Sequence, residues 1–244
     1  MNRFFISDGV TEDTVTITGQ DVNHIRNVLR LKSNDEIMVC DQKGRDYLCV
    51  ICEMDHDRVI ARVTDVYDNA AELPVAVTLF QGYPKSDKMD TIIQKTVELG
   101  VSRIVPVITK RTIARPDDKK AAKKTERYNA IALSAAKQSG RGMIPEVTAP
   151  VSFKEALRMA GELDMNIIPY EEAQGMAYSR QVISEIADRK SLGIFIGPEG
   201  GFTSDEVDAA AEAGASVITL GHRILRTETA GMTIMSIIMF ELEK

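Results

Sequence analysis

Alternating hydrophobic and polar residues mark short strands in the first part of the chain. Turn residues such as Gln42-Lys43-Gly44 separate these runs. A short helix is expected from Asp21 to Arg30, with Asp21 as its N-cap. The pattern predicts a small β-barrel or sandwich over residues 1–70. Its strands are expected at Glu36–Asp41, Asp46–Glu53 and Arg58–Tyr67.

The pattern changes after a polar stretch that ends at Pro74, where strand-like apolar runs begin to alternate with helical periodicity. Such alternation is typical of an α/β domain with a mostly parallel sheet and helices on both faces, here over residues 74–244. We expect its strands at Val75–Gln81, Arg103–Val107, Asn166–Pro169, Leu192–Ile196 and Ser216–Leu220. We expect its helices at Asp87–Leu99, Lys119–Gln138, Thr203–Ala213 and Thr229–Leu242.

Local signals fix the ends of some of these helices. Ser86 is a plausible N-cap for the first, and Thr203 with Glu206 three residues later has the form of a capping box. The last helix is apolar on almost every side from Met232 to Phe240. Such a helix must be buried on several sides, either in a deep core or at a dimer interface.

Two loops near the C-terminus each follow an apolar strand and open a helix. They are Gly197–Phe202 and Leu220–Ala230. Because the carboxyl ends of parallel strands meet at one edge of a sheet, we expect a ligand pocket there. Glycines in the first loop permit positive φ and a close approach of the ligand to the backbone. Either loop alone could be an ordinary strand-to-helix turn, but two convergent loops favour a binding site.

The glycine spacing in the first loop matches neither the dinucleotide-binding pattern nor the P-loop. Glu199 would also repel a phosphate placed on this loop. A ligand with adenine and ribose but no phosphate fits better, because backbone groups can bind an adenine edge and a carboxylate can accept hydrogen bonds from ribose hydroxyls. An enzyme for a phosphorylated nucleotide, with the anion at the following helix N-terminus, is the alternative.

The motifs in these loops are specific. They read Ile196-Gly197-Pro198-Glu199-Gly200-Gly201-Phe202 and Leu220-Gly221-x-Arg223-Ile224-Leu225-Arg226-x-Glu228-Thr229-Ala230. Further motifs are Lys85-x-x-Lys88, Gln138-Ser139-Gly140-Arg141 and His24-x-x-Asn27-Val28-Leu29-Arg30. Together they resemble, over nearly the whole chain, the RsmE family of 16S ribosomal RNA methyltransferases, which belongs to the SPOUT class.

The resemblance implies a fold. Residues 1–70 would form a PUA-like RNA-binding β-barrel. Residues 74–244 would form a SPOUT methyltransferase domain with a mostly parallel sheet, a C-terminal trefoil knot and the cofactor pocket inside it. The family also implies a homodimer. Nothing in the periodicity or spacing of the residues indicates the knot.

The resemblance also implies an activity, the transfer of a methyl group from S-adenosylmethionine to N3 of a uridine in 16S rRNA, position 1498 in standard ribosomal numbering. Arg226 is the candidate for stabilising charge that develops on the uracil, and Glu228 for orienting Arg226 or accepting the N3 proton. Glu228 could instead be a first-turn helix carboxylate. The cofactor-binding candidates are Pro169, Gly197, Glu199, Gly200, Gly201, Leu220, Gly221, Ile224, Leu225, Thr229 and Ala230.

Two other functions stay open. One is methylation of a ribose 2′-OH or of another base by an enzyme of the same class. The other is a non-catalytic RNA-binding or ribosome assembly factor. Whether the substrate is free RNA or the assembled small subunit is also open at this point.

Charge is distributed unevenly along the chain. The net charge is −6, yet residues 81–141 hold 14 Lys or Arg against 6 Asp or Glu. Such a segment suits contacts with a phosphate backbone, although a run such as Lys119-Lys120 is as well explained by a solvated helix face. The spacing of the first helix and the family motifs together give the RNA-binding candidates Arg3, Arg26, Arg30, Lys85, Lys88, Lys95, Arg111 and Arg141.

Cys49 and Cys52 form a C-x-x-C pair within an expected strand, where residues three apart point to opposite faces. No second pair completes a zinc site, so we expect buried thiols and no metal. We see neither the layout of a signal peptide nor an apolar run long enough to span a bilayer, and therefore expect a cytoplasmic protein.

Overall fold

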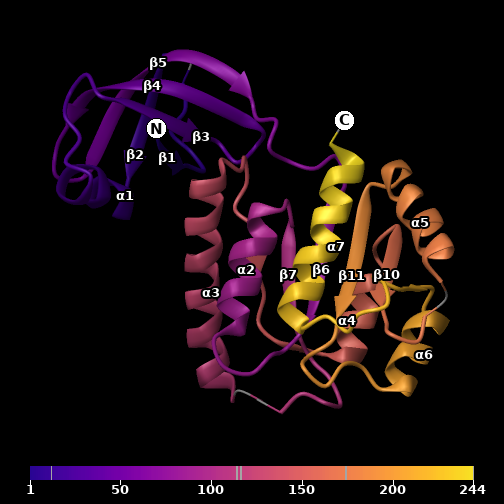
Figure 1. The fold of residues 1–244 in the computed structure, drawn as a ribbon. Coiled ribbons are helices and arrows are strands. Elements are labelled where there is room, and N and C mark those ends of the chain that lie inside the picture. The colour runs from indigo at the N-terminus through magenta and orange to yellow at the C-terminus, as the bar shows by residue number, and fades with distance from the viewer. Residues whose placement is uncertain (12, 114, 116, 174, 244) are drawn as a thin grey trace. The chain divides into compact units, whose positions relative to one another are not determined.

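The computed structural model describes the chain apart from residues 12, 114, 116, 174 and 244. Contacts divide the chain into two compact units. The first comprises Met1–Glu72 with Ala136–Ile144, and the second comprises Leu73–Ala135 with Pro145–Lys244 (Figure 1).

The first unit is built on a five-stranded sheet with the strand order β1-β3-β4-β5-β2. Its strands are β1 (Asn2–Phe5), β2 (Thr14–Thr18), β3 (Glu36–Cys40), β4 (Arg45–Met54) and β5 (Arg58–Asp68). β1 pairs with β3 in parallel, and the other pairs are antiparallel. Alternate apolar residues on these strands form one buried core that includes Ile37, Val39 and Ile51. The sequence predicted β3, β4 and β5 but missed β1 and β2.

The short helix of this unit differs from the sequence prediction. α1 (Gln20–Asn23) begins after Gly19 and continues as a π-helical turn, His24–Val28. Asp21 is therefore not the N-cap; it lies inside the first turn, and its carboxylate accepts a hydrogen bond from Lys137 at 2.9 Å. The prediction was wrong because glycine, which adopts φ 72° here, begins the helix without a side-chain cap.

The cysteines of this unit act as packing residues. Cys49 is buried and Cys52 is exposed, which confirms that the C-x-x-C pair points to opposite faces of β4. The expectation that all thiols are buried was wrong for Cys52. The buried Cys40 thiol donates to the Gly142 carbonyl at 2.9 Å, and this contact helps to place residues 136–144 in the first unit. Burial raises the pKa of both Cys40 and Cys49 to about 11.

The second unit contains a seven-stranded parallel sheet, in which β12-β10-β11-β6-β7-β8 lie in that order and β9 also pairs with β7. The strands are β6 (Ala76–Gly82), β7 (Arg103–Ile108), β8 (Glu146–Val147), β9 (Val151–Ser152), β10 (Met165–Pro169), β11 (Ser191–Ile196) and β12 (Ser216–Ile218). The five predicted strands are all present. The two-residue strands β8 and β9 are too short to give a sequence pattern.

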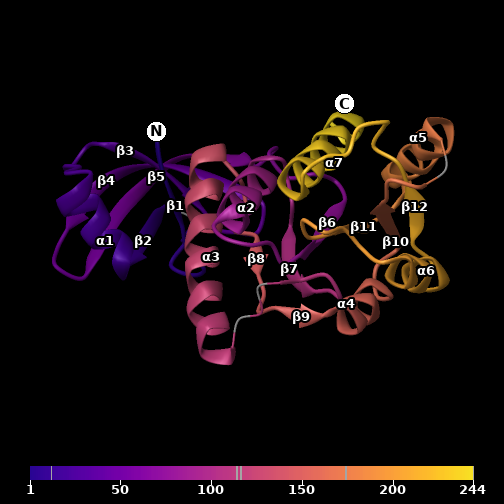
Figure 2. The ribbon, with the colours of Figure 1, turned by 60° about the horizontal axis from the view of Figure 1, so that its bottom comes forward.

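Helices cover both faces of this sheet (Figure 2). α4 (Phe153–Ala160) and α6 (Ser204–Glu212) pack on one face over Phe80 and Phe195. The rings of these two phenylalanines are stacked, with their centroids 4.5 Å apart. α2 (Lys88–Glu98) and α7 (Thr227–Leu242) lie on the other face and contact each other. The remaining helices are α3 (Asp118–Ser139), α5 (Met176–Ser184) and the 3-10 turn Ile186–Asp188.

Helix ends follow the sequence only in part. The capping box of Thr203 and Glu206 is confirmed. Ser86 is not the N-cap of α2; it adopts φ 56°, and Asp87 takes the cap position. α7 begins two residues earlier than predicted, at Thr227, and β12 ends two residues earlier, at Ile218. Within the described part of the chain, no helix is both long and apolar enough to cross a membrane.

Candidate functional site

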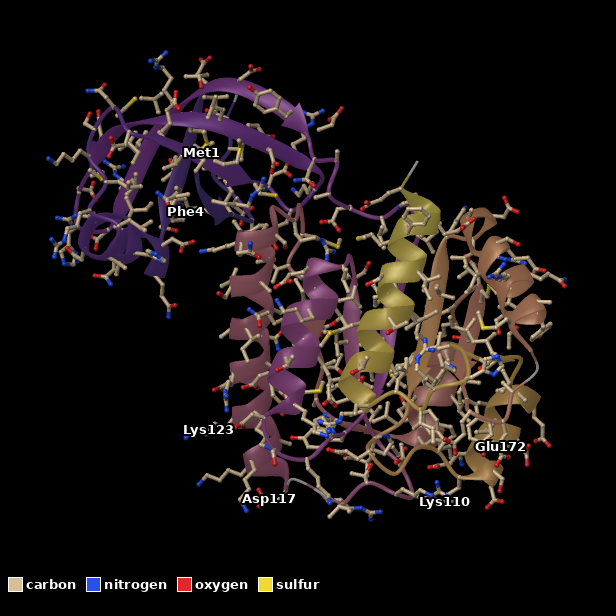
Figure 3. All side chains as sticks on the ribbon, viewed as in Figure 1. Met1, Phe4, Lys110, Asp117, Lys123 and Glu172 are labelled. Atoms are coloured by element: carbon tan, nitrogen blue, oxygen red, sulfur yellow. The ribbon has the colours of Figure 1, made fainter. Side chains whose placement is uncertain are left out.

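The order of the strands brings the two C-terminal loops together. The loop after β11 and the loop after β12 emerge on either side of β10, at the carboxyl edge of the parallel sheet. Both loops, with the segment that follows Pro169 at the end of β10, line one cavity of about 840 Å³. Figure 3 shows Lys110 and Glu172 at the same end of this sheet, each just after its strand. This edge is where an open α/β sheet places its ligand.

A buried chain of hydrogen bonds joins three segments below the cavity. Gln81, in β6, donates from Nε2 to Thr227 Oγ1 at 2.8 Å, and the Thr227 hydroxyl donates to the Gly197 carbonyl at 2.6 Å. Gln81 and Thr227 are 0% and 5% exposed. The start of α7 is thereby fixed against the first loop. Sequence reasoning did not predict this contact, because its partners lie 146 positions apart along the chain.

Replacement of Thr227 by valine tests this chain. The variant would keep the shape of the side chain but remove the Thr227 partner of the Gly197 carbonyl and of the Gln81 amide, which would keep its bond to the Gly82 carbonyl. We expect unfolding in urea to require about 1–3 kcal/mol less free energy than in the wild type. Thr233→Val is the control, since Thr233 lies on the same helix and makes no side-chain hydrogen bond with any residue that the structure describes. Equal stability of the two variants would contradict the assignment.

Glycines let the end of β6 lie against the first loop and let both loops turn. A Cβ on Gly82, at the end of β6, would lie 2.4 Å from the Pro198 nitrogen. Gly201 and Gly221 adopt φ 67° and 113°, a region that side chains rarely occupy. The bare backbone of both loops is therefore a requirement of the fold as well as a surface open to a ligand.

An ammonium group joins the two loops at the cavity. Lys88 Nζ lies 3.1 Å from Glu199 Oε1 and 3.5 Å from Glu228 Oε2. Burial acts to raise the pKa of Glu199, but its own amide, the Lys85 amide and the Lys88 ammonium outweigh burial and lower the pKa. The sequence placed Lys88 among the RNA contacts, whereas the structure places it in the cavity wall.

The structure brings most of the cofactor-binding candidates into this one cavity. Those that line it are Pro169, Gly197, Glu199, Gly200, Gly201, Leu220, Gly221, Ile224, Leu225 and Ala230. Thr229 does not line it and is exposed on the first turn of α7. Tyr170 and Thr219 line the cavity without having been predicted; their positions directly beside Pro169 and Leu220 were the available signal.

The two catalytic candidates occupy different surroundings. Arg226 lines the cavity as the exposed N-cap residue of α7. Glu228 does not line it, and its buried Oε2 has no hydrogen-bond partner among the described residues. Glu228 pairs with Lys88, and we find no contact between Glu228 and Arg226 in the part of the chain that the structure describes. An orienting role for Glu228 would thus act on Lys88 rather than on Arg226.

The RNA-binding candidates of the first unit divide by exposure. Arg26 and Arg30 are exposed, and Arg26 donates to the Asp55 carbonyl at 2.8 Å. Arg3 binds Asp46 through both terminal nitrogens at 2.6 and 2.7 Å, and its side chain is 13% exposed. Arg141 is 1% exposed and pairs with Glu72. Burial removes Arg141 from the candidate RNA contacts and leaves Arg3 little surface for one.

In the second unit, Lys85 is exposed and Lys95 pairs with Glu98 at 2.9 Å on the surface of α2. Arg111 lies at the cavity, where its Nη1 donates to the Gly200 carbonyl at 2.7 Å. Arg111 therefore supports the first loop directly. Sequence spacing could not show that Arg111 and Lys88 point toward the loops.

Comparison with known proteins places this geometry in a family. A family model described as an RNA methyltransferase domain matches residues 71–239, and one described as an RNA methyltransferase PUA domain matches residues 17–64. Ribosomal RNA small subunit methyltransferase E of Bacillus subtilis is 39% identical over 251 aligned positions, which cover 100% of this chain and 98% of the relative. The chain belongs to the ribosomal RNA small subunit methyltransferase E family.

Solved structures agree with membership of the methyltransferase E family. The methyltransferase E structure from Neisseria gonorrhoeae, bound to S-adenosyl methionine, has a TM-score of 0.83 and 34% identity, and the match covers 97% of this chain and 95% of that one. A crystal structure described only as a hypothetical protein has a TM-score of 0.92 and 38% identity, with 99% and 98% coverage. The two-part architecture, a PUA domain followed by a methyltransferase domain with a parallel sheet, is thereby confirmed.

Proposed function

We propose that this protein transfers a methyl group from S-adenosylmethionine to N3 of a uridine in 16S rRNA. One observation carries the proposal. The two motif loops form a single cavity in a chain that aligns over its full length with proteins named ribosomal RNA small subunit methyltransferase E. The uridine at position 1498 in ribosomal numbering is the proposed target.

The residues at the cavity fit the cofactor. The cavity offers loop backbone at Gly200, which is exposed, and at Gly201, which is half-buried, and an apolar side chain at Ile224, which is 83% exposed. A carboxylate, Glu199, stands at the same wall, which suits a cationic ligand and disfavours a phosphate. When bound, S-adenosylmethionine supplies an electrophilic methyl group. The loops 196–202 and 219–227 and Pro169 would hold it.

Methylation at N3 requires that the uracil lose its N3 proton. The neutral N3–H group is a poor nucleophile, so its proton must leave as N3 forms a bond to the methyl carbon, and negative charge develops on O2 and O4. Arg226 is the cavity arginine that we assign to this charge, because it opens α7 from the rim of the cavity. We assign Glu228 the role of accepting the N3 proton or, through its contact with Lys88, of holding Lys88 in place in the cavity wall.

RNA would bind through both domains. We propose residues 1–70 as the PUA-like RNA-binding domain and residues 74–244 as the catalytic SPOUT domain, whose trefoil knot would enclose the cofactor. Arg26, Arg30, Lys85 and Lys95 are the exposed or partly exposed candidates for phosphate contacts. The substrate could reach them as free RNA or within the assembled small subunit, and we place the protein in the cytoplasm.

A homodimer is part of the proposal. Phe240 and Ile237 on α7 are 82% and 36% exposed, although they belong to the helix that the sequence predicts to be covered on several sides. A second copy of the chain packed on this surface would remove both side chains from water.

Mapping of rRNA modifications by mass spectrometry tests the proposed function. Deletion of the gene is expected to remove one 3-methyluridine from 16S rRNA, and a plasmid copy of the wild type is expected to restore it. An unchanged map would reject the proposal. Loss of a ribose methyl group instead would move the target to the 2′-OH. A missing modification that a variant unable to bind S-adenosylmethionine still restores would indicate a non-catalytic assembly factor.

A further inference from the structure

Three charged side chains from separate elements meet beside the cavity, and two of them, Lys88 and Glu199, line it. They are Lys88 at the start of α2, Glu199 in the first loop and Glu228 in the first turn of α7, and we refer to them as the Lys88 cluster. Their side chains are 32%, 28% and 19% exposed. Because water reaches them only in part, their charges are screened less than those of a fully exposed pair.

The Lys88 cluster holds one ammonium between two carboxylates. With all three groups ionised it carries one net negative charge. The lowered pKa of Glu199 is consistent with a carboxylate there at neutral pH. Such a cluster attracts a cation at the cavity more strongly than it attracts a neutral group of the same shape.

Methyl transfer removes the positive charge from the cofactor, and a cluster with a net negative charge can distinguish the charged form from the neutral one. The S–CH₃ bond breaks with its electron pair left on sulfur, so a sulfonium cation becomes a neutral thioether. We propose that the Lys88 cluster makes the enzyme bind S-adenosylmethionine in preference to S-adenosylhomocysteine, with Lys88 limiting the preference by neutralising one carboxylate. This inference rests on the proposed function and identifies a specificity device within the same site.

Other charged groups also line the cavity, namely Arg111, Arg223, Arg226, Glu171 and Glu172. All five residues are exposed, Arg111 is engaged with the Gly200 carbonyl, and none takes part in the contacts among Lys88, Glu199 and Glu228. The charges of these five groups stay the same in variants that alter only the Lys88 cluster. A ratio of two dissociation constants in each variant therefore isolates the contribution of the cluster, because any loosening of the loops affects both ligands together.

Calorimetric titration with S-adenosylmethionine and with S-adenosylhomocysteine gives this ratio. We expect Lys88→Met, which leaves two carboxylates, to raise the preference for S-adenosylmethionine on the order of fivefold, the size expected for a partly exposed charge pair. We expect Glu199→Gln and Glu228→Gln each to lower the preference by a similar factor. Lys154→Met, a change at an exposed lysine of α4, is the control and should leave the ratio unchanged.

The test is decisive because the preference for S-adenosylmethionine is expected to rise in the lysine variant and to fall in the two carboxylate variants. A ratio that stays at the wild-type value in Lys88→Met, or one that moves in the same direction in the lysine and carboxylate variants, would overturn the inference. An unchanged ratio with a reduced salt dependence of RNA binding would return Lys88 to the phosphate contacts. Failure of the wild type to bind either ligand would instead reject the proposed function, so the two ideas fail separately.

Discussion

Replacement of Arg226 by alanine is expected to lower kcat for rRNA methylation by roughly 100- to 1000-fold, the usual loss when one donor to a developing oxyanion is removed. The reason is the position of Arg226, which stands at the cavity as the N-cap residue of α7. Its guanidinium can donate to a uracil oxygen as N3 loses its proton. Because this charge develops only during the reaction, the dissociation constant for S-adenosylmethionine should change little.

Two controls separate this role from a general effect on the fold. Arg189→Ala removes an exposed arginine just before β11, at the opposite edge of the sheet, and should leave kcat unchanged. Arg226→Lys keeps the charge but loses the planar fork of donors, and we expect it to recover only part of the rate. Steady-state methylation of a 16S rRNA substrate at saturating concentrations gives kcat. A full rate in Arg226→Ala would exclude Arg226 from the chemistry, and a large loss of cofactor affinity would make it a binding residue.

Much of the fold was predictable because hydrophobic periodicity records which side of an element is buried. Leu192–Ile196 is apolar at nearly every position, which is typical of a central parallel strand covered on both faces, and the structure places β11 in the middle of the sheet. Some of the elements that were missed carry weak patterns. β8 and β9 are two residues long, and α5 begins without a side-chain cap.

The site was predictable for a different reason. Its loops are continuous in sequence, so their glycines and charged residues form local motifs. The contacts that distant residues make with the loops carry no such signal, even for Lys88, which belongs to the Lys85-x-x-Lys88 motif. Gln81 and Lys88 lie in β6 and α2, far from the loops along the chain, and only the topology of the sheet brings them together. The family motif also led to Arg141 as a candidate RNA contact, since a buried arginine paired with Glu72 looks the same in a sequence as an exposed one.

Substitution of Gly82 by alanine is expected to have the second large effect. The new Cβ would lie 2.4 Å from the Pro198 nitrogen and 2.8 Å from the Gly197 carbonyl carbon. These are backbone atoms of the first loop, which the hydrogen bond from Thr227 to Gly197 holds in place. The methyl group therefore cannot be accommodated by a side-chain rotation, and β6 and the loop must separate. We expect a loss of about 1–3 kcal/mol in the free energy of unfolding, the range for an overpacked core.

The same substitution should also abolish tight binding of the cofactor, because the displaced loop forms one wall of the cavity. We expect the dissociation constant for S-adenosylmethionine to rise by more than about tenfold, as measured by calorimetry at a temperature where the variant is folded. Gly161→Ala is the matched control, since Gly161 has φ −65° and a Cβ there would meet only atoms at 3.4 and 3.7 Å. If Gly82→Ala bound the cofactor as tightly as this control, the contact between β6 and the first loop could not be what shapes the pocket.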